Sequence, residues 1–296
     1  MPTSQIEFRP LHAAHGAEVR GVDLSQPLDA EVARRLRTGW LHHQLLLFRG
    51  QRIDDPTHIR FARQFGHLEI FPEADQRSSQ HPEIFRVANT DEAGNLRRPD
   101  DPVAGYLTIV ESWHTDSAYR PIPSLGAALR ALAVPAEGGD TLFANLLAAG
   151  ESLPAGLRAR IARRTAVFSY EATRARAAGP VRALSEAEKH DTRAVRHSLL
   201  RRHPDRDNRV SLYISPLNIA GIEGMAEGEA SALLDELTDW ATQDRFVYRH
   251  RWQVGDLLLW DNRVTMHQVM PYDRARERRV MHRTALAGSE PVLPPL

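Results

Sequence analysis

The sequence predicts an α+β, β-rich fold: one sandwich or jelly-roll domain with flanking helices and loop insertions. Many short apolar runs are bounded by Gly, Pro, Asp and Asn, which is typical of strands joined by turns. Helical periodicity is confined to the N-terminal region and to insertions between strands, and no internal repeat or linker is evident. Strand-rich chains of this length commonly form one domain, so we expect residues 1–296 to be a single domain.

The composition excludes several classes of function. The chain has 38 basic and 38 acidic residues, so its net charge gives no indication that it binds nucleic acid or an anionic membrane. It has no cysteine, which excludes disulfides, thiolate metal sites and a cysteine nucleophile. Residues 1–8 lack the features of a signal peptide, and no apolar run approaches the roughly 20 residues of a membrane span. We therefore expect a cytoplasmic protein that binds neither nucleic acid nor membranes.

The first part of the chain predicts strands and helices in alternation. The expected elements are two strands within residues 5–24, a helix over 29–40, a strand over 44–48 and a helix over 55–66. Asp29 can cap the first of these helices, whose apolar residues recur at every fourth position. Asp55 and Pro56 are residue types favoured at the N-cap and first position of the second helix.

Two long polar segments are candidates for lids. Residues 67–105 are rich in Pro, Gly, Asp and Asn, with one short strand expected near 84–87. A loop of this length in a compact domain is usually disordered or a binding lid, and its position directly before a candidate metal motif favours the lid. Residues 174–207 are charged and interrupted by proline, so we expect a second mobile excursion there.

The remaining elements are mainly strands. They are strands over 124–134 and 141–144, one or two helices within 146–164, a strand over 210–214, a helix over 226–241, and strands over 246–250, 256–260, 264–269 and 279–285. The concentration of strands in the last third places most of the predicted sheet there.

His114 and Asp116 form the first candidate metal motif. In extended backbone, a spacing of two residues points both side chains to the same face. An imidazole nitrogen beside a carboxylate oxygen supplies two thirds of a two-histidine, one-carboxylate site for non-haem iron. The same motif recurs at His203 and Asp205, so the spacing alone does not choose between the two pairs.

A second histidine must come from elsewhere in the chain. His267 fits, because it follows a predicted strand and turn and lies in a second, largely apolar strand. His250 and His282 satisfy the same criterion, and a buried core histidine is the competing interpretation for each.

The last strand carries two arginines that could bind anions. Arg279 and Arg283 are four residues apart, so they point to one face about 13 Å from each other, with Met281 between them. A buried unpaired charge is unfavourable in a simple core but suits a cavity that receives two anions. Arginine meets a carboxylate with two charge-assisted hydrogen bonds. The competing interpretation is an arginine-rich edge strand that faces solvent.

Several motifs together resemble a known family over nearly the full length of the chain. The matching fragments are residues 16–24, 61–69, 113–116, 138–142, 260–267 and 278–283. The chain resembles the taurine dioxygenase and phenoxyacetate dioxygenase family of Fe(II)- and 2-oxoglutarate-dependent oxygenases. The resemblance implies a double-stranded β-helix (jelly-roll) core. It also implies that the reaction uses O2, releases succinate and CO2, and hydroxylates a small-molecule substrate. Relatives form dimers or tetramers, so a homo-oligomer is expected.

The resemblance also implies roles for individual residues. His114, Asp116 and His267 match the iron ligands, and Thr141 and Arg279 match the partners of a 2-oxoglutarate carboxylate. In the same way, Arg283 matches an arginine that holds the anionic end of the substrate. His203 falls in a variable insertion, where we expect it at the surface.

Two positions depart from the taurine pattern. Phe71 stands where taurine enzymes carry a histidine, and Val110 where they carry an asparagine. Both differences remove polar contacts and add apolar surface, whose burial against a ligand is worth roughly 1.5–3 kcal/mol for a large group. With Ser117 as a further expected contact, we predict an anionic substrate with an apolar body: an aryloxyalkanoate, alkyl sulfate or sulfonate cleaved at the hydroxylated carbon. The alternatives are a metal-dependent hydrolase and a non-catalytic jelly-roll binding protein.

Overall fold

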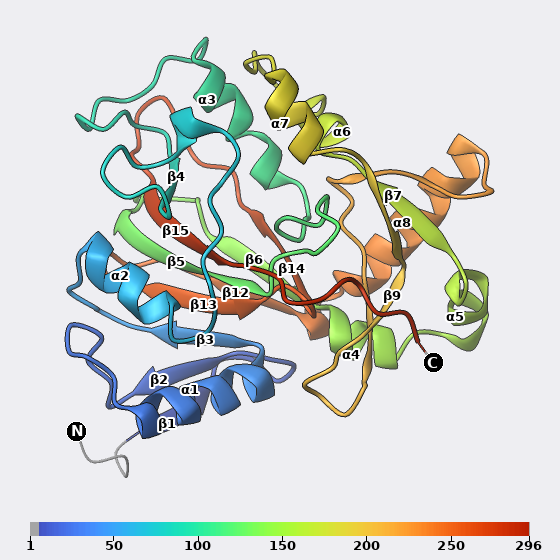
Figure 1. Cartoon of the computed structure of the whole chain (residues 1–296), viewed down its shortest axis with the longest axis horizontal. Coiled ribbons are helices and arrows are strands. Elements are labelled where there is room, and N and C mark those ends of the chain that lie inside the picture. Colours follow the sequence, from blue (N-terminus) through green and yellow to red (C-terminus); the bar gives the residue numbers. More distant parts are fainter. Residues whose placement is uncertain (1–5, 296) are drawn as a thin grey trace.

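The computed structural model describes residues 6–295 as a strand-rich α+β structure (Figure 1). Residues 1–5, which belong to the stretch expected to lack a signal peptide, lie outside the described residues, as does residue 296. The mixed, strand-rich character predicted from the sequence is confirmed. None of the described helices is both long and apolar enough to cross a membrane.

A seven-stranded sheet forms the centre of the molecule. Its strands, in spatial order, are β1 (Glu7–Pro10), β2 (Ala17–Arg20), β3 (Leu45–Phe48), β13 (Leu257–Asp261), β5 (Gly126–Ala133), β15 (Val280–Leu286) and β4 (Phe85–Ala88). Only the β2–β3 pair is parallel; the other neighbours are antiparallel. A three-stranded antiparallel sheet contains β12 (Val247–His250), β6 (Thr141–Asn145) and β14 (Thr265–Val269).

The central strands of the large sheet are apolar on both faces because both faces are covered. Leu257 and Leu259 point into a core shared with helices α1 (Ala30–His43) and α2 (Asp55–Ala62). Leu258 and Trp260, which alternate with them, point the other way into a core shared with Phe143 of β6. A strand buried on both faces has a continuous apolar sequence rather than alternation. The small sheet and the metal motif therefore lie on the face of the large sheet opposite α1 and α2.

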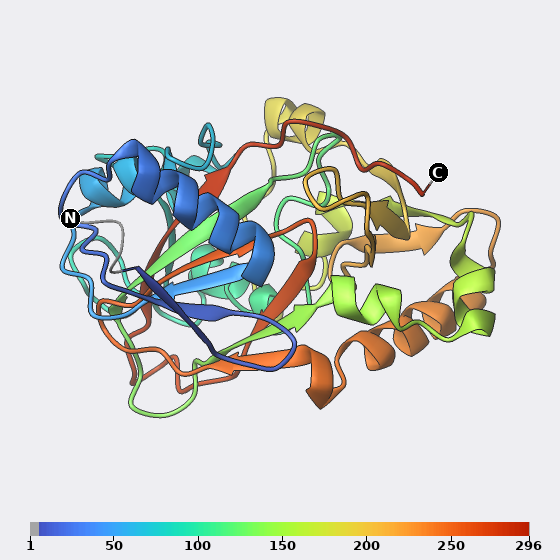
Figure 2. The same ribbon diagram turned by 90° about the horizontal axis from the view of Figure 1, so that it is seen from below.

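A second group of elements packs at the other end of the molecule (Figure 2). It contains the sheet β11 (Ile219–Ile222), β7 (Thr165–Phe168) and β8 (Val195–Ser198), the hairpin β9 (Leu200–Arg202) and β10 (Val210–Leu212), and helices α4 (Leu146–Glu151), α5 (Ala155–Ile161) and α8 (Glu227–Ala241). Helices α5 and α8 lie far from α1 and α2 in both views.

Most expected elements are confirmed within a few residues, with two corrections. The cap of α2 is Asp54 rather than Asp55, because the Asp54 carboxylate accepts the Thr57 amide N–H. The segment 174–207 is not a wholly irregular excursion. It contains α7 (Glu186–Asp191), β8 and β9, and α7 begins with a capping box between Ser185 and Glu188 that compensates for its lack of buried residues.

Other elements were not predicted because they are short and lack periodicity. They are β7, β11, α3 (Pro102–Tyr106), α6 (Tyr170–Arg174) and the 3₁₀ turns Ala74–Gln76, Ile109–Glu111 and Asp244–Phe246. Elements of three to five residues are stabilised by their tertiary contacts more than by local propensity.

Acid should destabilise the fold through three buried histidines. Burial lowers the pKa of His15 and His197 to about 4 and that of His58 to about 3. The unfolded chain binds protons below about pH 6.5 that these folded side chains do not, so stability present at pH 7 is lost as the pH falls toward 4. The expected slope is up to about 1.4 kcal/mol per pH unit for each histidine. Urea unfolding at pH 7, 6 and 5 measures it; His197→Asn should give a shallower slope, and an unchanged slope would contradict this assignment.

Candidate active site

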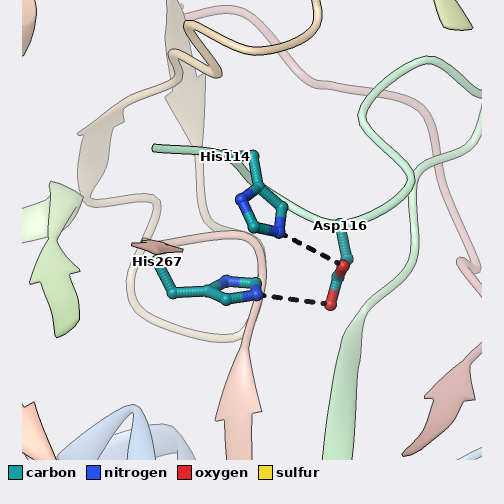
Figure 3. Close-up of side chains that lie close together, drawn as sticks. All are labelled: His114, Asp116 and His267. Carbon is teal, nitrogen blue, oxygen red and sulfur yellow. Dashed lines mark ion pairs between the residues drawn. The ribbon is translucent and has the colours of Figure 1, made fainter. Parts of the chain in front are cut away.

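The structure brings His114, Asp116 and His267 together in one buried cluster (Figure 3). Their ligand atoms all lie within 4.8 Å of one another. His114 Nε2 and His267 Nε2 are each 4.0 Å from an oxygen of Asp116, close to the separation of two donors on one metal ion, about 4 Å at most. The backbone sets this arrangement, because His114 and His267 exchange two amide hydrogen bonds of 2.9 and 2.8 Å.

The residues between the two ligands of the motif fix their direction. Thr115 is turned away from the cluster, where its hydroxyl donates to the Thr265 carbonyl at 3.1 Å. This alternation is the one that the spacing of two residues predicts. Ser117 follows with φ of 54°, and this left-handed residue turns the chain away from the cluster directly after Asp116.

The three side chains are in the protonation states that a metal requires. The Ser112 carbonyl lies 2.8 Å from His114 Nδ1, so Nδ1 carries the proton and Nε2 presents its lone pair to the cluster. Burial lowers the pKa of both histidines, so both are neutral at pH 7. Burial alone would raise the pKa of Asp116, but Arg283 and the two histidines outweigh it and hold that pKa below its usual value.

An orphaned polar atom shows that the cluster fits a metal ion. Asp116 Oδ2 is buried and has no hydrogen-bond partner among the described residues. A buried carboxylate oxygen without a partner is strongly unfavourable, and metal coordination would satisfy it. Two imidazoles with one carboxylate, bound on one side of the ion, form the donor set typical of non-haem iron.

Arg279 is a buried cation next to Thr141. It lies one residue before β15, and its Nε donates to the Gly139 carbonyl at 3.0 Å while Nη2 lies 3.3 Å from Thr141 Oγ1. Within residues 6–295 no carboxylate lies within 4 Å of its guanidinium, and burial lowers its pKa to about 10. Gly139 has φ of 67°, and a Cβ there would lie 3.3 Å from Arg279 Cδ. Glycine at this position therefore leaves room for the Arg279 side chain.

Arg283 reaches the metal cluster from the neighbouring part of β15. Its Nη1 donates to Asp116 Oδ1, and its guanidinium lies over the Phe85 ring at 4.6 Å. Met281, between the two arginines, is fully buried in the inner core. Arg283 is therefore part of a cavity wall, and the alternative of a solvent-facing edge strand is wrong for this residue.

A cavity adjoins the cluster, and five of its fifteen lining residues are Phe or Tyr. It is lined by Phe71, Phe85, Tyr106, Ile109, Val110, His114, Thr115, Asp116, Ser117, Tyr119, Tyr170, Thr173, Leu217, Asn218 and Arg283. Three expected substrate contacts, Phe71, Val110 and Ser117, are among them. Sequence reasoning missed four further aromatic rings, because Phe85, Tyr106 and Tyr170 lie in elements of four or five residues and Tyr119 lies in a turn after the metal motif.

The other candidate histidines lie elsewhere. The expectation that His203 lies at the surface is wrong: it is fully buried, and its Nε2 is 3.1 Å from Asp261 Oδ2. The β9–β10 hairpin carries it against the end of β13, where Asp261 is also held by Arg263. His250 pairs with Asp256 and His282 with Asp55, so neither joins the metal cluster.

Comparison with known proteins identifies the family of this chain. The sequence model of the taurine catabolism dioxygenase TauD, TfdA family matches residues 7–285. The chain belongs to this family. It is a 2-oxoglutarate-dependent dioxygenase, which removes the metal-dependent hydrolase and the non-catalytic binding protein as alternatives.

Individual relatives match over almost their whole length. The α-ketoglutarate-dependent 2,4-dichlorophenoxyacetate dioxygenase of Cupriavidus pinatubonensis is 33% identical over 95% of this chain and 98% of its own. The (S)-phenoxypropionate/α-ketoglutarate dioxygenase of Sphingobium herbicidovorans is 33% identical over 96% and 95%. The crystal structure of AAD-2 in complex with Mn(II) and N-oxalylglycine aligns with a TM-score of 0.87 and 32% identity over 97% and 98%.

Proposed function

We propose that His114, Asp116 and His267 bind Fe(II), and that Thr141 and Arg279 bind the distal carboxylate of 2-oxoglutarate. The observation that carries this proposal is Arg279, a buried guanidinium with no carboxylate partner among the described residues, next to a threonine hydroxyl. A buried charge of this kind calls for an anion. When bound, iron supplies the oxygen chemistry that converts 2-oxoglutarate to succinate and CO2 and hydroxylates the substrate.

The charges around the cluster support an anionic substrate. Arg279, Arg283 and a divalent ion bring four positive charges, against the one negative charge of Asp116. The dianion 2-oxoglutarate cancels two of them, so one positive charge remains. The nearby carboxylate of Glu69 is already paired with Arg120 at 3.6 Å. A monoanionic substrate held by Arg283 would balance the site.

The walls of the cavity support an aromatic body for that substrate. Phe71 and Phe85 lie with their centroids 4.2 Å apart, and Tyr119 and Tyr170 with theirs 4.5 Å apart. Aromatic walls bind a flat ring through burial and through stacking or edge contacts, worth about 0.5–1.5 kcal/mol per pair beyond burial. We therefore propose an aryloxyalkanoate, which falls apart after hydroxylation of the carbon that bears the ether oxygen. An alkyl sulfate or sulfonate would satisfy Arg283 but would make no ring contact with these walls.

A substrate panel tests the proposed function. The purified chain, with Fe(II), ascorbate and 2-oxoglutarate, is given aryloxyalkanoates, alkyl sulfates, alkyl sulfonates and taurine, and succinate and product are measured together. We expect aryloxyalkanoates to give the highest kcat/KM and taurine the lowest. Equal rates with alkyl sulfates would contradict the aromatic assignment, and no substrate-stimulated succinate with any compound would contradict the proposed site.

We propose that segments 67–105 and 174–207 cover the cavity together. Helices α3 and α7, one from each segment, lie at the same side of the molecule (Figure 1). Glu73, which is buried, accepts hydrogen bonds from the Tyr170 hydroxyl at 2.5 Å and from Arg174. The segments also touch where a Cβ on Gly105 would meet the Pro180 carbonyl oxygen at 2.3 Å.

Replacing Glu73 with glutamine should loosen this cover. Gln keeps an acceptor for Tyr170 but leaves the buried Arg174 without its counter-charge, a change that is strongly destabilising locally. We expect the KM of the aryloxy substrate to rise several-fold and the ratio of succinate to hydroxylated product to increase, because water gains access. The matched control is Glu83→Gln, in the same segment as Glu73. It removes a surface ion pair with Arg63 and should change neither the KM nor the ratio of succinate to product. An unchanged ratio in Glu73→Gln would contradict the cover.

Three broader expectations stay predictions. We propose that the seven-stranded and three-stranded sheets form the double-stranded β-helix core of one domain, in support of which Phe143 of β6 and His267 of β14 pack against Trp260 of β13. A homo-oligomer and a cytoplasmic location follow only from the resemblance and the sequence.

A further inference from the structure

Thr141 is contacted on two sides by groups that can only donate hydrogen bonds. Trp252 Nε1 lies 2.9 Å from Thr141 Oγ1, and Arg279 Nη2 lies 3.3 Å from the same oxygen. Neither an indole N–H nor a guanidinium has an acceptor, whereas a hydroxyl has two lone pairs and one proton. Both lone pairs of Thr141 are therefore occupied, and its own proton must point away from Trp252 and Arg279.

No group within the described part of the chain takes that proton. Thr141 is buried, and among residues 6–295 its hydroxyl has no hydrogen-bond acceptor. A buried donor without a partner is unfavourable by about 1–3 kcal/mol, so the position suits a ligand that supplies an acceptor. A carboxylate can only accept when it is ionised, which makes it the complement of Thr141 and Arg279.

The fold places Trp252 accurately for this contact. Strands β12 and β6 pair so that His250 lies opposite Thr141, and Trp252 follows two residues after the end of β12. The indole lies edge-to-face against the His250 ring, with centroids 4.5 Å apart and an interplanar angle of 88°. His250 is fixed in turn, since Nε2 lies 3.1 Å from Asp256 Oδ2 and Nδ1 lies 3.0 Å from the Tyr248 hydroxyl.

We propose that Trp252 is a positioning residue for the cosubstrate, whose indole N–H holds the Thr141 hydroxyl as a donor to the distal carboxylate of 2-oxoglutarate. This inference rests on the proposed role of Thr141 and Arg279. Trp252 itself does not touch the carboxylate. Without the indole N–H, one lone pair of Thr141 is unpaired and its hydroxyl is no longer held in one orientation, so the carboxylate loses part of its hydrogen bonding although Thr141 and Arg279 are intact.

A double-mutant cycle tests the coupling. Trp252→Phe keeps an aromatic ring and removes the N–H, and we expect it to raise the KM for 2-oxoglutarate by about 3- to 10-fold with little change in kcat. Thr141→Val should raise that KM by a similar or larger factor. In the Thr141→Val background, Trp252→Phe should add less than about 2-fold, because the hydroxyl that it orients is gone. The same factor in both backgrounds would show a packing role and overturn the inference.

A spectroscopic measurement on the unaltered chain gives an independent answer, even if Trp252→Phe does not fold. The five tryptophans give five indole N–H signals in a ¹⁵N-labelled protein, assigned by Trp→Phe substitutions at the other four positions. We expect 2-oxoglutarate, added to the Zn(II)-loaded protein, to shift the Trp252 signal and slow its hydrogen exchange. The indole of Trp240, which donates to the Ala149 carbonyl at 3.0 Å on a remote helix, should stay unchanged. An unshifted Trp252 signal would overturn the inference.

The KM values for 2-oxoglutarate in the variants separate failure of this inference from failure of the proposed function. If Thr141→Val and Arg279→Ala both leave the KM for 2-oxoglutarate unchanged, the cosubstrate site itself is wrongly placed. If both raise it but Trp252→Phe acts independently of Thr141, the site stands and only the role of Trp252 fails. Trp240→Phe is the control for loss of an indole N–H that donates to a protein oxygen, and its KM for 2-oxoglutarate should equal that of the unaltered chain.

Discussion

Replacing His114 with alanine should abolish 2-oxoglutarate turnover while leaving the fold intact. The imidazole is one of the three proposed metal donors, and its loss leaves Asp116 and His267 as the remaining two. Loss of a group that merely orients a metal ligand lowers affinity by about 10- to 100-fold, so loss of a ligand should exceed about 100-fold. Succinate release measures turnover, and Mn(II) titration followed by electron paramagnetic resonance measures the metal site without requiring catalysis.

The second His-x-Asp motif supplies the matched control for this experiment. His203 is buried like His114 but pairs with Asp261, which keeps three hydrogen bonds from Arg263 after the histidine is removed. We expect His203→Ala to lower the melting temperature and to keep stoichiometric Mn(II) binding in the folded protein. Full turnover in His114→Ala, or loss of the Mn(II) site in His203→Ala alone, would contradict the assignment of the cluster.

The contrast between these two motifs shows what local spacing can and cannot predict. Period-two alternation correctly places His114 and Asp116 on one face, with Thr115 on the other, and it applies wherever backbone is extended. It does not distinguish a ligand pair from a core pair, because that depends on which distant residue lies opposite. His267 meets His114 through a backbone bridge across 153 positions of the chain, and nothing in the local sequence of His203 shows that Asp261 will meet it.

The central strands and the longer helices are predictable for a related reason. The run 257–260 is apolar throughout because both faces of the sheet are covered, and α1 carries its own cap at Asp29. The cover of the cavity is different. Glu73, Tyr170 and Arg174 lie in short, irregular or weakly periodic segments, and the buried Glu73–Arg174 ion pair exists only after distant parts of the chain have packed together. Single-sequence patterns therefore predict the scaffold and the ligand motif but miss much of the aromatic wall.

Replacing Arg283 with alanine should raise the KM for an anionic substrate by about 10- to 100-fold, the range expected for loss of charge-assisted hydrogen bonds. The aromatic side chains of the cavity remain, but the positive charge that lies over the Phe85 ring is lost. Substrate-independent decay of 2-oxoglutarate should be spared, because Thr141 and Arg279 are untouched. The KM for the substrate, the KM for 2-oxoglutarate and the rate of uncoupled succinate release are measured in the same preparation.

Arg283 also contacts Asp116, so its removal has a second consequence that the experiment must separate. Arg283 helps to hold the pKa of Asp116 below its usual value, so the pKa rises in Arg283→Ala and protonation competes with the metal as the pH falls. Metal affinity should therefore weaken toward acidic pH but stay close to normal at pH 8, where the KM comparison is made. Arg279→Ala provides the opposite pattern: a raised KM for 2-oxoglutarate with the substrate KM preserved. If Arg283→Ala raises both KM values equally at pH 8, Arg283 serves the cosubstrate, and the anion-binding role moves to another group in the cavity.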